Sequence, residues 1–71
     1  MNYNIGDQVE WEWGNGTARG QIQKVYTRKI TRKIKETEVT RDADDSNPAY
    51  YVEQSGGGEV LKSHSEIRKA S

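Results

Sequence analysis

A strictly alternating segment near the beginning of the chain constrains the fold more than any other sequence feature. Within residues 8–13 every second side chain is apolar, and these side chains belong to Val9, Trp11 and Trp13. This period of two is typical of a strand that buries one face. The Asn15-Gly16 pair that follows is a strong signal for a tight turn. We therefore predict a β-hairpin in which residues 18–26 return alongside the first strand.

The returning strand carries an irregularity near its end. Alternate residues from Ala18 to Tyr26 would lie on one face of a regular strand. The apolar Val25 would then lie on the other face. A bulge or a twist near Lys24 reconciles the two sets, because a bulge inserts one extra residue into one strand of a pair. We therefore predict a bulge or a twist at this position.

The kinds of apolar residue extend the β prediction to the whole chain. The 71 residues include five Ile, five Val, four Tyr and two Trp, but one Leu. β-branched and aromatic side chains suit a pleated, half-buried surface. A small, strongly bent barrel leaves few strand edges exposed. We predict an all-β, SH3-like or Tudor-like barrel of five to six antiparallel strands, formed by one domain over residues 1–71 with its folded part at about 4–69.

Residues 27–34 read TRKITRKI and allow two interpretations. Tyr26, Ile30 and Ile34 are spaced as on one helix face. Thr and Ile favour strands instead, and the apolar helix face would be short. We favour extended structure here, followed by a turn at residues 35–37.

The rest of the chain alternates loops and strands. The expected order is a loop at 41–48, a strand at 49–54, a glycine loop at 55–58 and a strand at 59–62. Ser63 and Glu66 have the spacing of a capping box, which predicts a short C-terminal helical turn. Residues 69–71 are expected to fray.

Several classes of function are poorly supported by the sequence. There is no Cys and one His, His64, so disulfides, cysteine metal sites and sites with two imidazoles are excluded. The Asp42, Asp44 and Asp45 cluster lacks the Gly and the bidentate Glu of a calcium loop. We expect no catalytic site, metal or cofactor. The absence of a long apolar run or a signal peptide predicts a cytoplasmic protein without membrane contact.

The formal net charge of zero hides three blocks of charge. Residues 1–18 carry −3, residues 19–41 carry +6 and residues 42–71 carry −3. In one interpretation the basic strands form weak surface pairs with the acidic ones. In the other, a basic stripe follows a phosphate backbone; its candidate residues are Arg28, Lys29, Arg32, Lys33 and Lys35. Net neutrality argues against the second interpretation.

Four motifs together resemble the hypervirulence-associated protein Tudor domain family, which includes short bacterial and fungal proteins. They are GDQVEWEWGNGTARGQI at 6–22, TRKIKETEVTRDA at 31–43, NPAYYVEQ at 47–54 and VLKSHSEI at 60–67. The resemblance implies a Tudor-like, SH3-type barrel and brings no defined ligand or reaction. Relatives often have Gly in the turn after Ile34-Lys35, where this chain has Glu36. A positive φ at this position would strain Glu36.

Aromatic residues are the best lead to a function. Tudor-type barrels can hold methylated Lys or Arg in an aromatic cage by cation–π attraction. The candidates here are Trp13, Tyr26, Tyr50 and Tyr51. Most aromatics of so small a domain must fill its core, and Tyr50 and Tyr51 point to opposite faces, so one of them should lie outside.

The function predicted from the sequence is a non-enzymatic binding module that is a monomer or a weak homodimer. It recognises a protein or peptide through Trp13, Tyr26 and the exposed tyrosine. The alternative is nucleic-acid binding through the basic segment 28–35. A third interpretation is a stable domain with a structural role and no small ligand.

Overall fold

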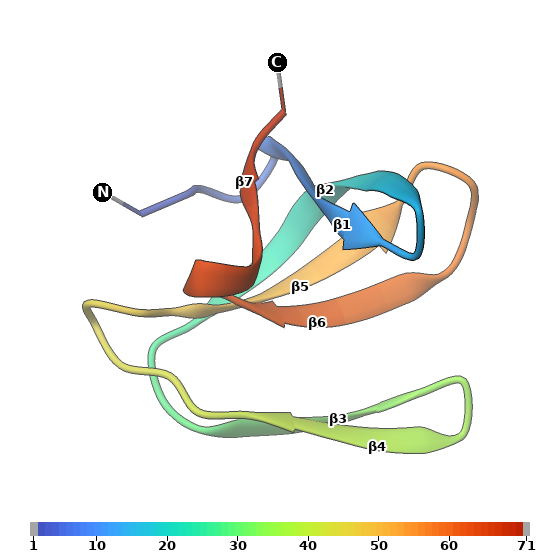
Figure 1. The fold of residues 1–71 in the computed structure, drawn as a ribbon. Helices are drawn as coiled ribbons and strands as arrows, with labels where there is room; N and C mark the ends of the chain where they lie inside the picture. Colours follow the sequence, from blue (N-terminus) through green and yellow to red (C-terminus); the bar gives the residue numbers. More distant parts are fainter. Residues whose placement is uncertain (1, 71) are drawn as a thin grey trace.

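The structure, a computed structural model, describes residues 2–70, and seven strands and one short 3-10 helix lie in this range. In chain order these are β1 (Gln8–Trp13), β2 (Gly16–Tyr26), β3 (Ile30–Ile34), β4 (Thr37–Arg41), β5 (Ala49–Gln54), β6 (Glu59–Ser63), η1 (His64–Glu66) and β7 (Arg68–Lys69). The strands form a five-stranded sheet in the order β6-β5-β2-β1-β7 and a separate β3–β4 hairpin. Figure 1 shows β1 and β7 on one side of β5 and β6, and the β3–β4 hairpin on the other. The small, all-β, barrel-like architecture is confirmed, with more strands than the predicted five to six.

The first hairpin follows the sequence prediction closely. β1 and β2 pair from Gln8 opposite Gln21 to Trp13 opposite Gly16. Gly14 in the turn has a φ of 56°, which glycine adopts without the steric penalty of a side chain. The irregularity is also confirmed, because the pairing of β2 with β5 shifts register between Ile22 and Lys24.

The segment with two interpretations is extended, as predicted. β3 pairs with β4 from Ile30 opposite Arg41 to Ile34 opposite Thr37. The two turn residues have positive φ angles, 49° at Lys35 and 67° at Glu36. A left-handed conformation costs a residue with a side chain about 1–2 kcal/mol. Glu36 therefore carries the strain expected of a positive φ, and Lys35 shares it.

The C-terminal segment does not fray up to its last described residue, so this part of the prediction is wrong. β7 pairs with β1 at Val9 and Glu10, and the Ala70 amide donates a hydrogen bond of 3.0 Å to the Gln8 carbonyl. The Arg68 guanidinium also pairs with the Glu10 carboxylate, with Nη2 2.8 Å from Oε2. Backbone pairing and this ion pair explain the order. Ser71 lies outside the described residues.

The two faces of β5 and β6 belong to two different packing clusters. Tyr50 and Val52 of β5 join the barrel core, whose other buried members are Val9, Trp11, Ile22 and Ile67. Tyr51 and its cross-strand neighbour Leu61 have the opposite parity. The hairpin packs on this second face, because the Arg32 guanidinium lies 4.3 Å from the centre of the Tyr51 ring.

The predicted capping box is present at the start of η1. The Ser63 amide donates to Glu66 Oε1 at 2.8 Å. Burial raises the pKa of Glu66, but this effect is outweighed by the hydrogen bond from Ser63, the hydrogen bond and charge of Arg41, and the charge of Lys62. The net result is a pKa below its ordinary value, so the charged form of Glu66 is favoured in the folded protein.

Replacing Gly20 with Ala is expected to destabilise the fold. A Cβ atom at Gly20 would lie 2.5 Å from the Glu53 carbonyl oxygen and 2.6 Å from Val52 Cγ1, and such overpacking costs about 1–3 kcal/mol. Urea unfolding followed by Trp fluorescence measures the change. Gly16→Ala is the control, since a Cβ atom there meets nothing within 4 Å. Equal stability of the two variants would contradict the close contact.

Glu66 is expected to make stability depend on pH. Its folded pKa lies below its unfolded value, so its contribution is full above the unfolded pKa and is lost as the pH falls through the folded one. The free energy of unfolding should therefore fall more steeply on acidification in the native protein than in Glu66→Gln. The comparison uses urea unfolding from neutral pH to below pH ~4. Parallel pH profiles would argue against the low pKa.

Candidate functional site

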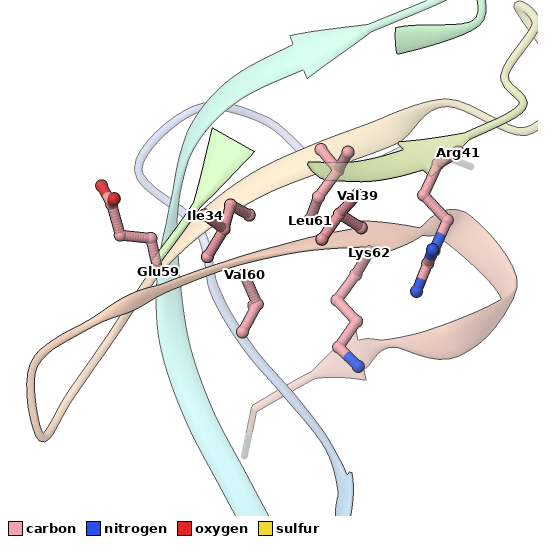
Figure 2. A pocket seen from close by; sticks show the side chains of 7 residues that line it. All are labelled: Ile34, Val39, Arg41, Glu59, Val60, Leu61 and Lys62. Atoms are coloured by element: carbon pink, nitrogen blue, oxygen red, sulfur yellow. The ribbon is translucent and has the colours of Figure 1, made fainter. Parts of the chain in front are cut away.

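A hollow between the β3–β4 hairpin and β6 is the candidate site. Its volume is about 150 Å³. Its apolar lining residues are Ile34, Val39, Val60 and Leu61. Its polar lining residues are Arg41, Glu59 and Lys62. Figure 2 shows Arg41 and Lys62 near one end of this hollow and Glu59 at the other. We call this hollow the β4–β6 groove.

The sheet topology explains why the groove exists. β6 is the last strand of its sheet, and in the described part of the chain β4 pairs with β3 alone. The two strands therefore approach each other without joining in a ladder. Strand alternation directs Leu61 of β6 and Ile34 of β3 to the space between the hairpin and β6. Both side chains are buried there. An unpaired strand edge is a place where another chain can bind.

One end of the groove is positively charged. Arg41 Nε lies 2.9 Å from Glu66 Oε1, so a carboxylate already offsets the Arg41 charge. Lys62 has no ion pair within 4.0 Å among residues 2–70. The Lys62 Nζ atom lies 5.7 Å from the centre of the Trp11 ring, a cation–π distance that fixes the charge at the barrel rim.

The opposite end of the groove carries a carboxylate. Glu59 is exposed, and its Oε2 atom accepts a hydrogen bond from the Tyr51 hydroxyl. The groove therefore has a positive end at Lys62, a negative end at Glu59 and an apolar floor between them.

The structure does not bring the four predicted aromatic residues together. The Trp13 side chain is 72% exposed at the tip of the β1–β2 hairpin, whereas Tyr26 ends β2 ten residues from the paired Gly16. At about 3.3 Å per residue, this separates the two by roughly 30 Å along the strand. Tyr50 is fully buried and Tyr51 is partly buried, so Tyr51 is the tyrosine that points away from the core.

Tyr26 and Tyr51 do lie close to one cation, but this cation belongs to the chain itself. Arg32 Nη1 donates a 3.0 Å hydrogen bond to the Tyr26 hydroxyl, and the same guanidinium covers the Tyr51 ring. Arg32 therefore takes the place that a cationic ligand would need on these rings. The pair contributes to hairpin packing in this structure.

Tyr50 has a role in the core rather than on a binding surface. Its hydroxyl accepts a hydrogen bond from the Tyr3 amide at 3.2 Å and lies 3.1 Å from His64 Nδ1. Desolvation by burial raises the pKa of Tyr50, so the phenol stays neutral. The Tyr3 and His64 rings also lie against each other, with centroids 5.2 Å apart and a tilt of 33° between their planes. This cluster anchors the N-terminal segment to η1.

The basic segment 28–35 is only partly available. Arg28 and Lys29 lie in the β2–β3 connection, and they are exposed together with Lys33 and Lys35, whereas Arg32 points towards Tyr51. No ion pair between residues 2 and 70 involves any of these five side chains. The interpretation in which the basic block 19–41 pairs with the acidic blocks therefore holds for Arg19 and Arg41, which contact Glu10 and Glu66, but not for segment 28–35. The paired cations are Arg19, Arg41 and Arg68.

Other kinds of site receive no support from the described residues. Within residues 2–70, no group of three or more His, Asp or Glu side chains is placed to hold a metal ion. Among the helical segments of the same range, none has the length and apolar character needed to cross a membrane.

Sequence reasoning missed the groove because its lining comes from three strands. The available signals were Val39 in the EVTR motif and the Val60-Leu61 pair, but neither indicates that the strands approach without pairing.

Comparison with known proteins identifies the family. Residues 6–67 match the family model described as the hypervirulence associated proteins TUDOR domain. None of the curated proteins and none of the solved structures matches the chain. The family match spans both sheets and most of the strands described above. The chain therefore belongs to the family of hypervirulence-associated proteins with a Tudor domain.

Proposed function

We propose that this chain is a non-enzymatic binding module that holds a segment of another protein in the β4–β6 groove. The observation that carries the proposal is an apolar hollow beside two strand edges without ladder partners. An extended segment suits such a place, because strand edges bind extended chains and neighbouring pockets select their side chains. Membership in a Tudor domain family supports a binding role.

The size of the groove favours one apolar side chain as the anchor of the ligand. Its volume is about 150 Å³, and an apolar cavity of about this volume accommodates benzene. Burying one large apolar side chain contributes about 1.5–3 kcal/mol. One anchor of this kind gives a weak complex by itself, so rim contacts must add to the affinity.

The proposal keeps the predicted protein or peptide ligand but moves the contact surface. Trp13 stands apart from Tyr26 and Tyr51, and Arg32 already fills the space on the two tyrosines. The groove is the better candidate, since its apolar lining has no equivalent occupant within the described residues.

A random peptide library displayed on phage tests this function. Peptides selected on the native protein are measured by fluorescence anisotropy against Val39→Arg and Thr40→Arg. Val39 lines the groove, whereas Thr40 is exposed on the other face of β4. We expect Val39→Arg to weaken binding at least tenfold and Thr40→Arg to leave it unchanged. Amide NMR shifts of the native protein, confined to the groove, give a second test that needs no variant.

A selection that yields no peptide sensitive to Val39→Arg, or peptide shifts that map elsewhere, would overturn the proposal. Thermal unfolding of both variants shows whether the folded state is kept.

Nucleic-acid binding by the basic segment is the second candidate function. The observation that favours it is the lack of ion pairs at Arg28, Lys29, Lys33 and Lys35 within the described residues. Cations without protein partners are free to neutralise phosphates. This function does not depend on the groove.

A short mixed-sequence oligonucleotide provides the test of this second function. Its affinity should fall steeply between about 50 and 200 mM salt, because bound phosphates release counterions. The double variant Lys29→Glu, Lys33→Glu should abolish binding, and Lys69→Glu on β7 serves as the control. Absence of binding at low salt would eliminate this candidate.

A further inference from the structure

We propose that the β4–β6 groove selects an extended segment in which an acidic side chain accompanies the apolar anchor, and that Lys62 recognises this carboxylate. The inference rests on the proposed function and names the chemistry of its ligand. Lys62 is then a specificity-determining residue of the groove.

The two cations at one end of the groove differ in their contacts. Arg41 is held by Glu66 at 2.9 Å and also donates to the Thr40 carbonyl at 3.0 Å. Glu66 therefore offsets the charge of Arg41, and two of its five N–H donors are used within the chain. Lys62 acts on Glu66 only through its charge and has no carboxylate within 4.0 Å in residues 2–70, so it retains free donors.

Lys62 lies next to the apolar part of the groove. Lys62 directly follows Leu61, and both line the groove. Lys62 is the cross-strand neighbour of Tyr50, so its side chain leaves β6 on the face opposite to Leu61, where its ammonium lies 5.7 Å from the centre of the Trp11 ring. A ligand whose apolar side chain enters the groove brings its neighbouring residues within reach of this ammonium.

The other end of the groove carries the opposite charge. Glu59 precedes Lys62 by three residues on β6, a separation of about 10 Å in a strand. A bound extended segment has the same rise per residue. Its acidic residue at the Lys62 end and a basic or neutral residue about three positions away, near Glu59, complement both ends. An acidic residue near Glu59 is disfavoured by repulsion.

The test uses peptides from the selection on the native protein, in synthetic versions that carry Glu, Gln or Lys at the position next to the apolar anchor. Their affinities are measured at 150 mM salt for the native protein and for Lys62→Gln, Lys62→Glu and Lys69→Glu. Lys69 is exposed on β7 and does not line the groove, so Lys69→Glu controls for the change in net charge.

We expect the native protein to bind the Glu version about fivefold more tightly than the Gln version, the upper range for a partly exposed ion pair. Lys62→Gln should remove this preference, Lys62→Glu should reverse it in favour of the Lys version, and Lys69→Glu should leave it intact. The pattern of preferences is independent of the stability of any one variant.

Equal affinities of the three peptides for the native protein, or equal effects of Lys62→Glu and Lys69→Glu, would overturn the inference. If the same peptides nevertheless bind Val39→Arg more weakly than the native protein, the proposed function is still supported. A groove covered by a second copy of the chain would give a different result. The native protein would then sediment as a dimer, Val39→Arg as a monomer, and no peptide would be selected, which contradicts both proposals.

Discussion

The close contact between β2 and β5 at Gly20 is the constraint on which the rest of the fold depends. Gly20 lies opposite Val9 of β1 and Gln54 of β5 at once, so β2 joins the two halves of the five-stranded sheet at this residue. A side chain there would collide with the β5 backbone. Because β7 is attached through β1 and β6 through β5, the approach of these strands around Trp11 and Tyr50 requires this contact.

The β3–β4 hairpin is the element that turns a small barrel into a surface with a groove. It is inserted between β2 and β5, which pair with each other. Arg32 binds it to Tyr26 and Tyr51, and Ile34 is buried. The hairpin nevertheless forms its own sheet. The β4–β6 groove therefore results from a contact made by side chains where backbone pairing is absent. The positive φ angles at Lys35 and Glu36 show that the β3–β4 hairpin forms despite backbone strain in its turn.

The distribution of charge matters more than its sum of zero. Glu10 holds Arg68 and, more distantly, Arg19, and Glu66 holds Arg41. These pairs fasten β7 to β1 and the end of β4 to η1. Lys62 and the exposed cations of segment 28–35 are left without carboxylate partners in the described residues. Glu10 and Glu66 thus serve internal contacts, whereas Lys62 and segment 28–35 lie at two separate places, which is why the two proposed functions can be tested independently.

The sequence by itself determined β1 to β6, the hairpin turns, the bulge near Lys24 and the Ser63–Glu66 cap, because period, turn chemistry and capping are local, whereas β7 was not foreseen. The tertiary structure alone decided which residues are covered. Trp13 shares its parity with the buried Val9 and Trp11 but is exposed, since β5 pairs with β2 only from Gly20 onwards and β7 reaches only Val9 and Glu10. The groove was equally beyond the sequence, because its lining depends on how closely unpaired strands approach, and that distance is set by the packing of distant side chains.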